Sequence, residues 1–83
     1  MAKLEKLPPI HPGEILQGDL MKPLGISMNR LALDLRVPVT RIAEIVHQQR
    51  GITPDTALRL GRYFNTSARF WLNAQAAYDL EVV

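Results

Sequence analysis

Proline and glycine divide this chain into short segments, and their spacing is the sequence feature that most limits its fold. Six prolines and five glycines are spread through 83 residues. The segments between them carry apolar residues at helical spacing, and none shows the alternating β-branched pattern that favours a strand. A chain of this length has room for one hydrophobic core. We therefore expect a single all-α domain built from short helices.

Most of the expected helices begin at a residue that suits a helix start, either a side chain that accepts a backbone hydrogen bond or a proline. These residues are Pro12, Ser27, Thr53 with Pro54, and Ser67. The first helix is expected to end by Pro23 and Gly25. Only Arg36-Val37-Pro38 separates the second helix, residues 28–35, from a third helix of about Val39 to Gln48. Two short helices joined by a tight turn fit a helix-turn-helix arrangement.

The small net charge of +2 lies entirely in the middle of the chain. Residues 1–26 and 51–83 are each balanced, whereas residues 27–50 carry four arginines against two carboxylates. The excess positive charge therefore falls on the two helices of the expected helix-turn-helix unit. Four arginines on a small protein can also be ordinary solvated surface, and charge alone does not separate these readings.

The third helix has a polar face that can read DNA bases. Helical spacing turns Ile42, Ile45 and Val46 inward and leaves a polar surface opposite them. The base-reading candidates, with the contacts that their chemistry allows, are Arg41 to guanine, Gln48 to adenine, Thr40 to a base edge or methyl group, and Glu44 to cytosine. The candidates for phosphate contacts, which position a protein without specifying sequence, are Asn29, Arg30, Arg36, Gln49 and Arg50.

The last helix carries apolar residues on two sides. One side holds Phe70, Trp71, Ala74, Ala77 and Tyr78, and the other holds Leu72, Ala76, Leu80 and Val83. One side can pack on the body of the domain, but a domain of this size has no second core for the other. We therefore expect a homodimer whose interface contains Leu72, Ala76, Leu80 and Val83. Fraying of a C-terminal helix is the alternative explanation.

Nothing in the sequence indicates catalysis, a metal or a cofactor. There is no cysteine, and the two histidines, His11 and His47, lack a ligand-spacing motif. His11 is expected at a helix start, and His47 either contacts DNA or faces water. The only serines, Ser27 and Ser67, are expected caps rather than nucleophiles. Trp71 could stack on a ligand, but its helical spacing favours packing.

The sequence shows neither a membrane-spanning segment nor a signal peptide, which favours an intracellular location. No apolar run reaches the roughly 20 residues that span a bilayer, and the N-terminus lacks the apolar core of a signal peptide. We expect a cytoplasmic protein without a membrane partner. Residues 1–10 are expected to form an N-terminal extension, and residues 11–83 to form the DNA-binding domain with a C-terminal dimerisation helix.

An ordered series of motifs over residues 10–80 resembles HigA/VapI-type antitoxins of the XRE helix-turn-helix family. The motifs are His11-Pro12-Gly13-Glu14-Ile15-Leu16, Gly25-Ile26-Ser27, Leu31-Ala32, Val37-Pro38-Val39-Thr40-Arg41-Ile42, Arg50 to Leu60, Phe70-Trp71-Leu72-Asn73 with Gln75, and Tyr78-Asp79-Leu80. The resemblance implies a five-helix, lambda-repressor-like fold. It also implies a homodimer that binds a palindromic operator, represses its own operon and neutralises a HigB-type mRNA endoribonuclease.

The chain departs from this family pattern at three positions. Arg36 stands where the turn usually has glycine, so a positive φ there would be strained. Pro38 replaces the usual serine before the third helix and cannot cap it with a side chain. Gln48 replaces a glycine just after that helix, so the helix is expected to run longer. An orphan regulator without a toxin would show the same features, whereas an interaction module that has lost DNA binding is disfavoured, because the excess positive charge coincides with the groove-facing polar residues.

Overall fold

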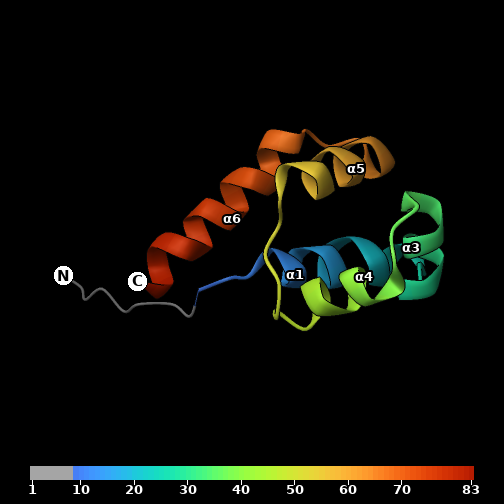
Figure 1. Cartoon of the computed structure of the whole chain (residues 1–83), viewed down its shortest axis with the longest axis horizontal. Coiled ribbons are helices and arrows are strands. Elements are labelled where there is room, and N and C mark those ends of the chain that lie inside the picture. Colours follow the sequence, from blue (N-terminus) through green and yellow to red (C-terminus); the bar gives the residue numbers. More distant parts are fainter. Residues whose placement is uncertain (1–8) are drawn as a thin grey trace.

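The computed structural model describes residues 9–83 as an arrangement of helices (Figure 1). The helical elements are α1 (Pro12–Glu14), η1 (Ile15–Met21), α2 (Lys22–Leu24), α3 (Met28–Leu35), α4 (Val39–Val46), α5 (Pro54–Phe64) and α6 (Ala68–Val82). The first three run into one another, so the described part of the chain has five helices and no strand, as predicted. Most of the expected N-terminal extension, residues 1–8, lies outside the described residues. No helix within residues 9–83 has the length and apolar character needed to cross a membrane.

The first helix continues through Pro23 instead of ending there. Its middle, η1, is π-helical, and the N–H of Lys22 donates to the carbonyl of Gln17. The wider turns of a π-helix precede Pro23, whose nitrogen has no hydrogen to donate and whose ring would crowd an α-helical turn. The helix ends one residue later, where Gly25 takes a left-handed conformation. The prediction that this helix ends by Pro23 and Gly25 is confirmed, because its last residue is Leu24.

The predicted helix starts are confirmed by their hydrogen bonds. The hydroxyl of Ser27 accepts from the Arg30 N–H at 3.0 Å, and that of Ser67 accepts from the Phe70 N–H at 3.0 Å. Thr53 caps α5 in the same way, with Pro54 in its first turn. His11 caps α1, because its Nδ1 accepts from the Gly13 N–H at 2.9 Å. Each cap satisfies a backbone N–H that the helix itself leaves without an acceptor.

Four helices end at a residue with positive φ, and only one of these residues is glycine. The left-handed residues are Gly25, Arg36, Gln48 and Asn65. In each case the backbone N–H of the next residue donates to the carbonyl five residues earlier, as Val37 N–H does to the Ala32 carbonyl at 3.0 Å, and this bond closes the end of the helix. Arg36, at φ 62°, confirms the expected strained turn. A side chain in this conformation costs on the order of 1 kcal/mol relative to glycine.

The end of α4 corrects one expectation. The helix stops at Val46 and does not extend to Gln48. Gln48 has φ 64°, and the Gln49 N–H donates to the Glu44 carbonyl at 2.7 Å, which closes the helix end. Gln48 thus adopts the left-handed conformation that glycine favours, and its side chain does not continue the surface of α4.

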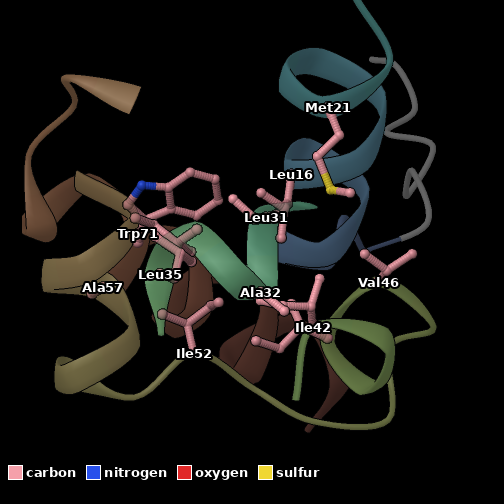
Figure 2. Packing of buried hydrophobic residues seen from close by; sticks show 12 residues of the cluster. Leu16, Met21, Leu31, Ala32, Leu35, Ile42, Val46, Ile52, Ala57 and Trp71 are labelled. Atoms are coloured by element: carbon pink, nitrogen blue, oxygen red, sulfur yellow. The ribbon is translucent and has the colours of Figure 1, made fainter. Parts of the chain in front are cut away.

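The hydrophobic core draws on every helix, with Trp71 of α6 fully buried beside residues of α3 and the α4–α5 connection (Figure 2). Its indole Nε1 donates to the hydroxyl of Thr66 at 2.9 Å, so the one polar atom of this side chain is satisfied. Leu16, Leu31, Ile42, Ile45 and Leu60 are also completely buried. The inward side of α4 is therefore as predicted.

The two faces of α6 are divided differently from the sequence prediction. The side facing the body carries Ala68, Trp71, Leu72 and Tyr78, together with Gln75, whose Oε1 accepts from the Ile52 N–H at 2.8 Å. Leu72 packs partly against the core, whereas Phe70 is 42% exposed. The apolar residues on the outer side of α6 are Phe70, Ala76, Ala77 and Leu80; together with Val83, which directly follows the helix, we call this set the outer α6 face.

The prediction placed Leu72 on the outer side and Phe70 and Ala77 on the inner side, and these three assignments are wrong. The helix approaches the body along the row that runs through Trp71 and Gln75. A step of 100° per residue brings Leu72 toward that row and turns Phe70 away from it.

Candidate nucleic-acid interface

Direct backbone packing holds α4 in place. A Cβ atom added at Gly13 would collide with the carbonyl oxygen of Ile45, so α1 and α4 approach more closely than any side chain would allow. Ile42 and Ile45 are fully buried beneath α4. The helix therefore cannot move along or away from the body without opening the core, and its outer residues are presented by a rigid support.

The outer side of α4 is polar and accessible. Thr40 is exposed, Arg41 and Glu44 are partly buried, and His47 and Gln48 are exposed just beyond the end of the helix. Pro38 precedes the helix without a side-chain cap, as expected, and the Arg41 N–H donates to its carbonyl at 3.0 Å. This end of α4 thus presents N–H groups, a hydroxyl and a guanidinium that could meet a phosphate or a base edge.

Two of the base-reading candidates are engaged by other charged side chains. The Nη1 of Arg41 donates to Oδ2 of Asp55 at 3.2 Å. The Nε of Arg50, a phosphate-contact candidate, donates to Oε1 of Glu44 at 2.8 Å. Glu44 and Arg50 therefore lie together, and the pair leaves less of the Glu44 carboxylate to accept a bond from cytosine. Within residues 9–83, the structure shows no side-chain hydrogen bond for Thr40.

Asp55 connects α4 to α5 and α3. Besides Arg41, it accepts a bond from the Nε of Arg59 at 3.1 Å, and the Nη1 of Arg59 donates to the Leu35 carbonyl at 2.7 Å. The hydrogen bond from Arg59, with the positive charges of Arg59 and Arg41, lowers the pKa of the Asp55 carboxyl. Arg59 places its positive charge at the C-terminal end of α3, where the helix dipole favours a cation.

The phosphate-contact candidates are exposed but do not form one cluster. Asn29 and Arg30 lie in the first turn of α3, and the Nε of Arg30 bonds Oδ2 of Asp34 at 3.1 Å. The same oxygen accepts from the Tyr63 hydroxyl at 2.7 Å, and this bond raises the pKa of Tyr63. Arg30 is therefore linked through Asp34 to α5, and no ion pair or hydrogen bond joins it to α4.

Arg36, Gln49 and Arg50 flank the two ends of α4 and are exposed. Within residues 9–83, Arg30, Arg41 and Arg50 each form an ion pair with a carboxylate, and Arg36 does not. Three of the four central arginines are thus paired, but Asp34 and Glu44 are already counted in the central excess of +2, and only Asp55 adds a carboxylate from outside this region. Such exposed pairs contribute little to stability and can exchange partners in contact with DNA.

The two histidines have different environments. His11 is buried, and its ring makes an edge-on contact with Tyr78 of α6 at a centroid distance of 4.8 Å. Burial lowers the pKa of His11, against the opposing charges of Asp79 and Glu14. The expected role at a helix start is confirmed, because Nδ1 caps α1 and the ring links the first helix to the last. His47 is exposed at the end of α4.

Sequence reasoning missed Asp55, Arg59, Asp34 and Tyr63. One signal was available, because Asp55 and Arg59 are four residues apart in the first turns of a predicted helix, a spacing that favours an ion pair. The contact of Asp55 with Arg41, 14 residues away, depends on how α5 packs beside α4 and leaves no local pattern.

Together, α3, its left-handed turn and the exposed α4 define a helix-turn-helix protein, and the comparisons with known proteins agree. A helix-turn-helix family model, HTH_3, matches residues 19–71. The chain is 57% identical over 77 residues to virulence-associated protein I of Dichelobacter nodosus, covering 93% of this chain and 71% of that protein. This chain therefore belongs to the XRE-type helix-turn-helix family.

Solved antitoxin structures are similar as well. The Pseudomonas aeruginosa antitoxin HigA, solved with the higBA promoter, is 50% identical with a TM-score of 0.88, over 89% of this chain and 80% of that one. The antitoxin GraA in complex with its operator is 39% identical with a TM-score of 0.84, over 95% and 80% of the two chains. The predicted lambda-repressor-like, five-helix architecture is thereby confirmed, as is the family resemblance.

Proposed function

We propose that this chain is a DNA-binding antitoxin that represses its own operon. The observation that carries the proposal is the outer side of α4, which is polar, exposed and rigidly supported at the position of the recognition helix. HTH proteins insert this helix into the major groove. The similarity to antitoxins solved with promoter and operator DNA supports the same use here. A binding role of this kind needs no catalytic residue, metal or cofactor.

In this proposal Thr40 and Arg41 contact bases, and Asn29, Arg30, Arg36, Gln49 and Arg50 contact phosphates. Gln48 reaches the groove from its left-handed position after α4. Glu44 reads cytosine only if Arg50 leaves it, and Arg50 is then free to meet a phosphate. The exchange replaces the Arg50–Glu44 ion pair with an Arg50–phosphate ion pair and a bond from cytosine to Glu44, so it need not weaken binding.

The protein acts as a homodimer on a palindromic operator. The outer α6 face supports this, because it leaves Leu80 at 79% exposure in a helix whose other side is packed. Exposed apolar surface of this kind commonly marks a protein interface. Two copies of α4 would then read two half-sites, and the doubled number of phosphate contacts would raise affinity.

The DNA-binding part of the proposal is tested by titrating the purified chain against a duplex from the region upstream of its own gene. We expect tight binding to this duplex, weaker binding to a scrambled duplex of the same length, and loss of affinity as salt increases. Equal affinity for the two duplexes would contradict sequence-specific binding. Sedimentation of the free protein at high micromolar concentration tests the dimer.

The toxin partner, a HigB-type mRNA endoribonuclease, is supported only by the similarity to HigA-type antitoxins. An orphan regulator would present the same α4, so DNA binding does not separate the two functions. Co-expression with a small basic reading frame immediately upstream does, since a toxin should be captured by this chain and lose its growth-inhibiting activity. Failure of capture would favour the orphan regulator.

A further inference from the structure

We propose that Asp55 is a positioning residue for Arg41, and that it increases the preference of the protein for its operator over other DNA. The inference rests on the proposed function, because it assigns a source of specificity to the same interface. Asp55 lies on α5, outside the helix-turn-helix unit formed by α3 and α4.

The contact leaves the most useful edge of the Arg41 guanidinium open. Asp55 receives its bond from Nη1 alone, and within residues 9–83 no acceptor is bonded to Nε or Nη2. These two nitrogens form the side-on edge that can donate two parallel hydrogen bonds to the O6 and N7 atoms of guanine. Asp55 therefore restrains Arg41 without occupying that edge.

Asp55 is itself anchored to the protein. Arg41 and Arg59 both donate to Oδ2 of Asp55, at 3.2 and 3.1 Å, and Arg59 is fixed to the Leu35 carbonyl at 2.7 Å. The Asp55 carboxyl is ionised near neutral pH, as an ordinary aspartate is, and its hydrogen bond from Arg59 lowers its pKa further. A chain of hydrogen bonds thus runs from the backbone of α3 through α5 to the side chain of Arg41 on α4.

Exposure of the pair does not argue against this role. The Arg41 side chain is 29% exposed and that of Asp55 is 59% exposed, so as an isolated surface pair they would add little stability. A positioning role requires only that fewer Arg41 rotamers compete with the binding one. Holding a long side chain in place before binding is worth roughly 2- to 10-fold in affinity.

The positioning effect can be separated from the effect of charge. Removing any carboxylate near the interface raises affinity for all DNA, because repulsion of phosphates falls. That gain applies to the operator and to scrambled DNA alike. The quantity to measure is therefore the ratio of the dissociation constants for a scrambled duplex and for the upstream duplex, at one salt concentration.

We expect Asp55→Asn to lower this ratio about 2- to 10-fold. Asp19→Asn, a change of equal charge at an exposed position on another helix, should leave the ratio unchanged. Arg59→Lys keeps the charge but loses the paired Nε and Nη1 bonds, so it should also lower the ratio. This second variant tests the anchor if Asp55→Asn weakens the start of α5.

The decisive measurement repeats Asp55→Asn in an Arg41→Ala background. If Asp55 acts through Arg41, the substitution should no longer change the ratio there. An equal decrease in both backgrounds, or a wild-type ratio for Asp55→Asn, would overturn the positioning role while leaving the proposed function standing. A wild-type protein with no preference for the upstream duplex would instead overturn the proposed function, and the role of Asp55 with it.

Discussion

Helices α4 and α6 bury one side each but leave different kinds of surface exposed. In α4 the residues Ile42, Ile45 and Val46 are buried, and the outer side is polar apart from the partly buried Ala43 and the exposed Val39 at its start. In α6 Trp71 is buried, and on the exposed side the apolar residues of the outer α6 face lie among the polar residues Arg69, Asn73 and Glu81. Both helices are thus well supported, and the difference lies in what their free sides can contact. A polar free side suits DNA, and an apolar one suits another protein surface.

The two helices also differ in length. Helix α4 has 8 residues, enough to cross a groove, and its ends are fixed by Pro38 and by the left-handed Gln48. Helix α6 has 15 residues, and the structure links its second half to the body through Tyr78 and His11.

The buried side of α6 should show the largest effect. Trp71→Ala removes a fully buried ring and its bond to Thr66, and should lower the free energy of unfolding by about 3–5 kcal/mol. Denaturant unfolding followed by circular dichroism measures the loss. Phe70→Ala, one residue away on the exposed side, is the matched control and should cost less than about 1 kcal/mol. Similar losses for both variants would contradict the assigned orientation of α6.

The buried side of α4 depends on its contact with α1. Gly13→Ala would drive a methyl group into the carbonyl of Ile45, and we expect a loss of about 3 kcal/mol in stability. Gly18→Ala is the control, since nothing lies near its Cβ position, and replacing a helical glycine should stabilise by up to about 1 kcal/mol. Thermal unfolding of the two variants compares them. A harmless Gly13→Ala would show that α4 is less tightly seated.

The free side of α6 should control self-association. Leu80→Glu places a charge in the outer α6 face and should weaken the dimer by at least about 2 kcal/mol, or roughly 30-fold, without unfolding the monomer. Analytical ultracentrifugation over a concentration series gives the dissociation constant. Leu33→Glu on α3, where the leucine is 68% exposed, should leave association unchanged. Equal effects of the two changes would place the interface elsewhere.

The free side of α4 should control operator affinity. Arg41→Ala is expected to cost about 1–3 kcal/mol in operator binding and to relax specificity at one base pair. Fluorescence anisotropy with single-base operator variants would locate that pair, and Arg62→Ala on the exposed side of α5 is the control. Equal affinity of the Arg41 variant and the wild type across salt concentrations would refute the assignment of Arg41 as a base-reading residue.

The link between His11 and Tyr78 should give the smallest effect. Burial places the pKa of His11 in the folded protein below its ordinary value of 6.5, so the unfolded chain binds more protons near that pH. Stability should be constant above about pH 7 and fall as the pH drops through and below 6.5. His11→Asn replaces the capping Nδ1 with a side-chain oxygen that can also accept the bond, and should flatten this part of the profile. An unchanged slope in unfolding measured from pH 5 to 8 would assign the effect to other groups.

Local chemistry made much of this fold predictable. The caps at Ser27, Thr53 and Ser67 depend on side chains within three residues of their partners, and the sequence therefore identifies them. The buried face of α4 follows from spacing alone. The family motifs add the order of the helices. Each of these predictions needs information from one segment of the chain.

The errors arise where two segments meet. The orientation of α6 depends on how Trp71 enters the core, and helical spacing alone could not distinguish Leu72 from Phe70 as the residue that follows it inward. The sequence predicts a longer α4 because Gln48 stands where the family has glycine. In the structure Gln48 nevertheless has φ 64°, and the helix ends before it. The ion pair of Arg41 with Asp55 is likewise a product of packing.

A small change of angle at the corner between α5 and α6 would produce a large displacement at the far end of α6. A Cβ atom at Gly61 would lie 2.9 Å from the Thr66 carbonyl oxygen, so the two helices meet almost without clearance. The 15 residues of α6 extend about 22 Å from this corner. A tilt of 10° there would move the far end by about 4 Å, close to the rise of one base pair. In a dimer joined through α6, the close packing at Gly61 would fix the angle of α6. That angle would set the distance between the two α4 helices and so between the half-sites that they read.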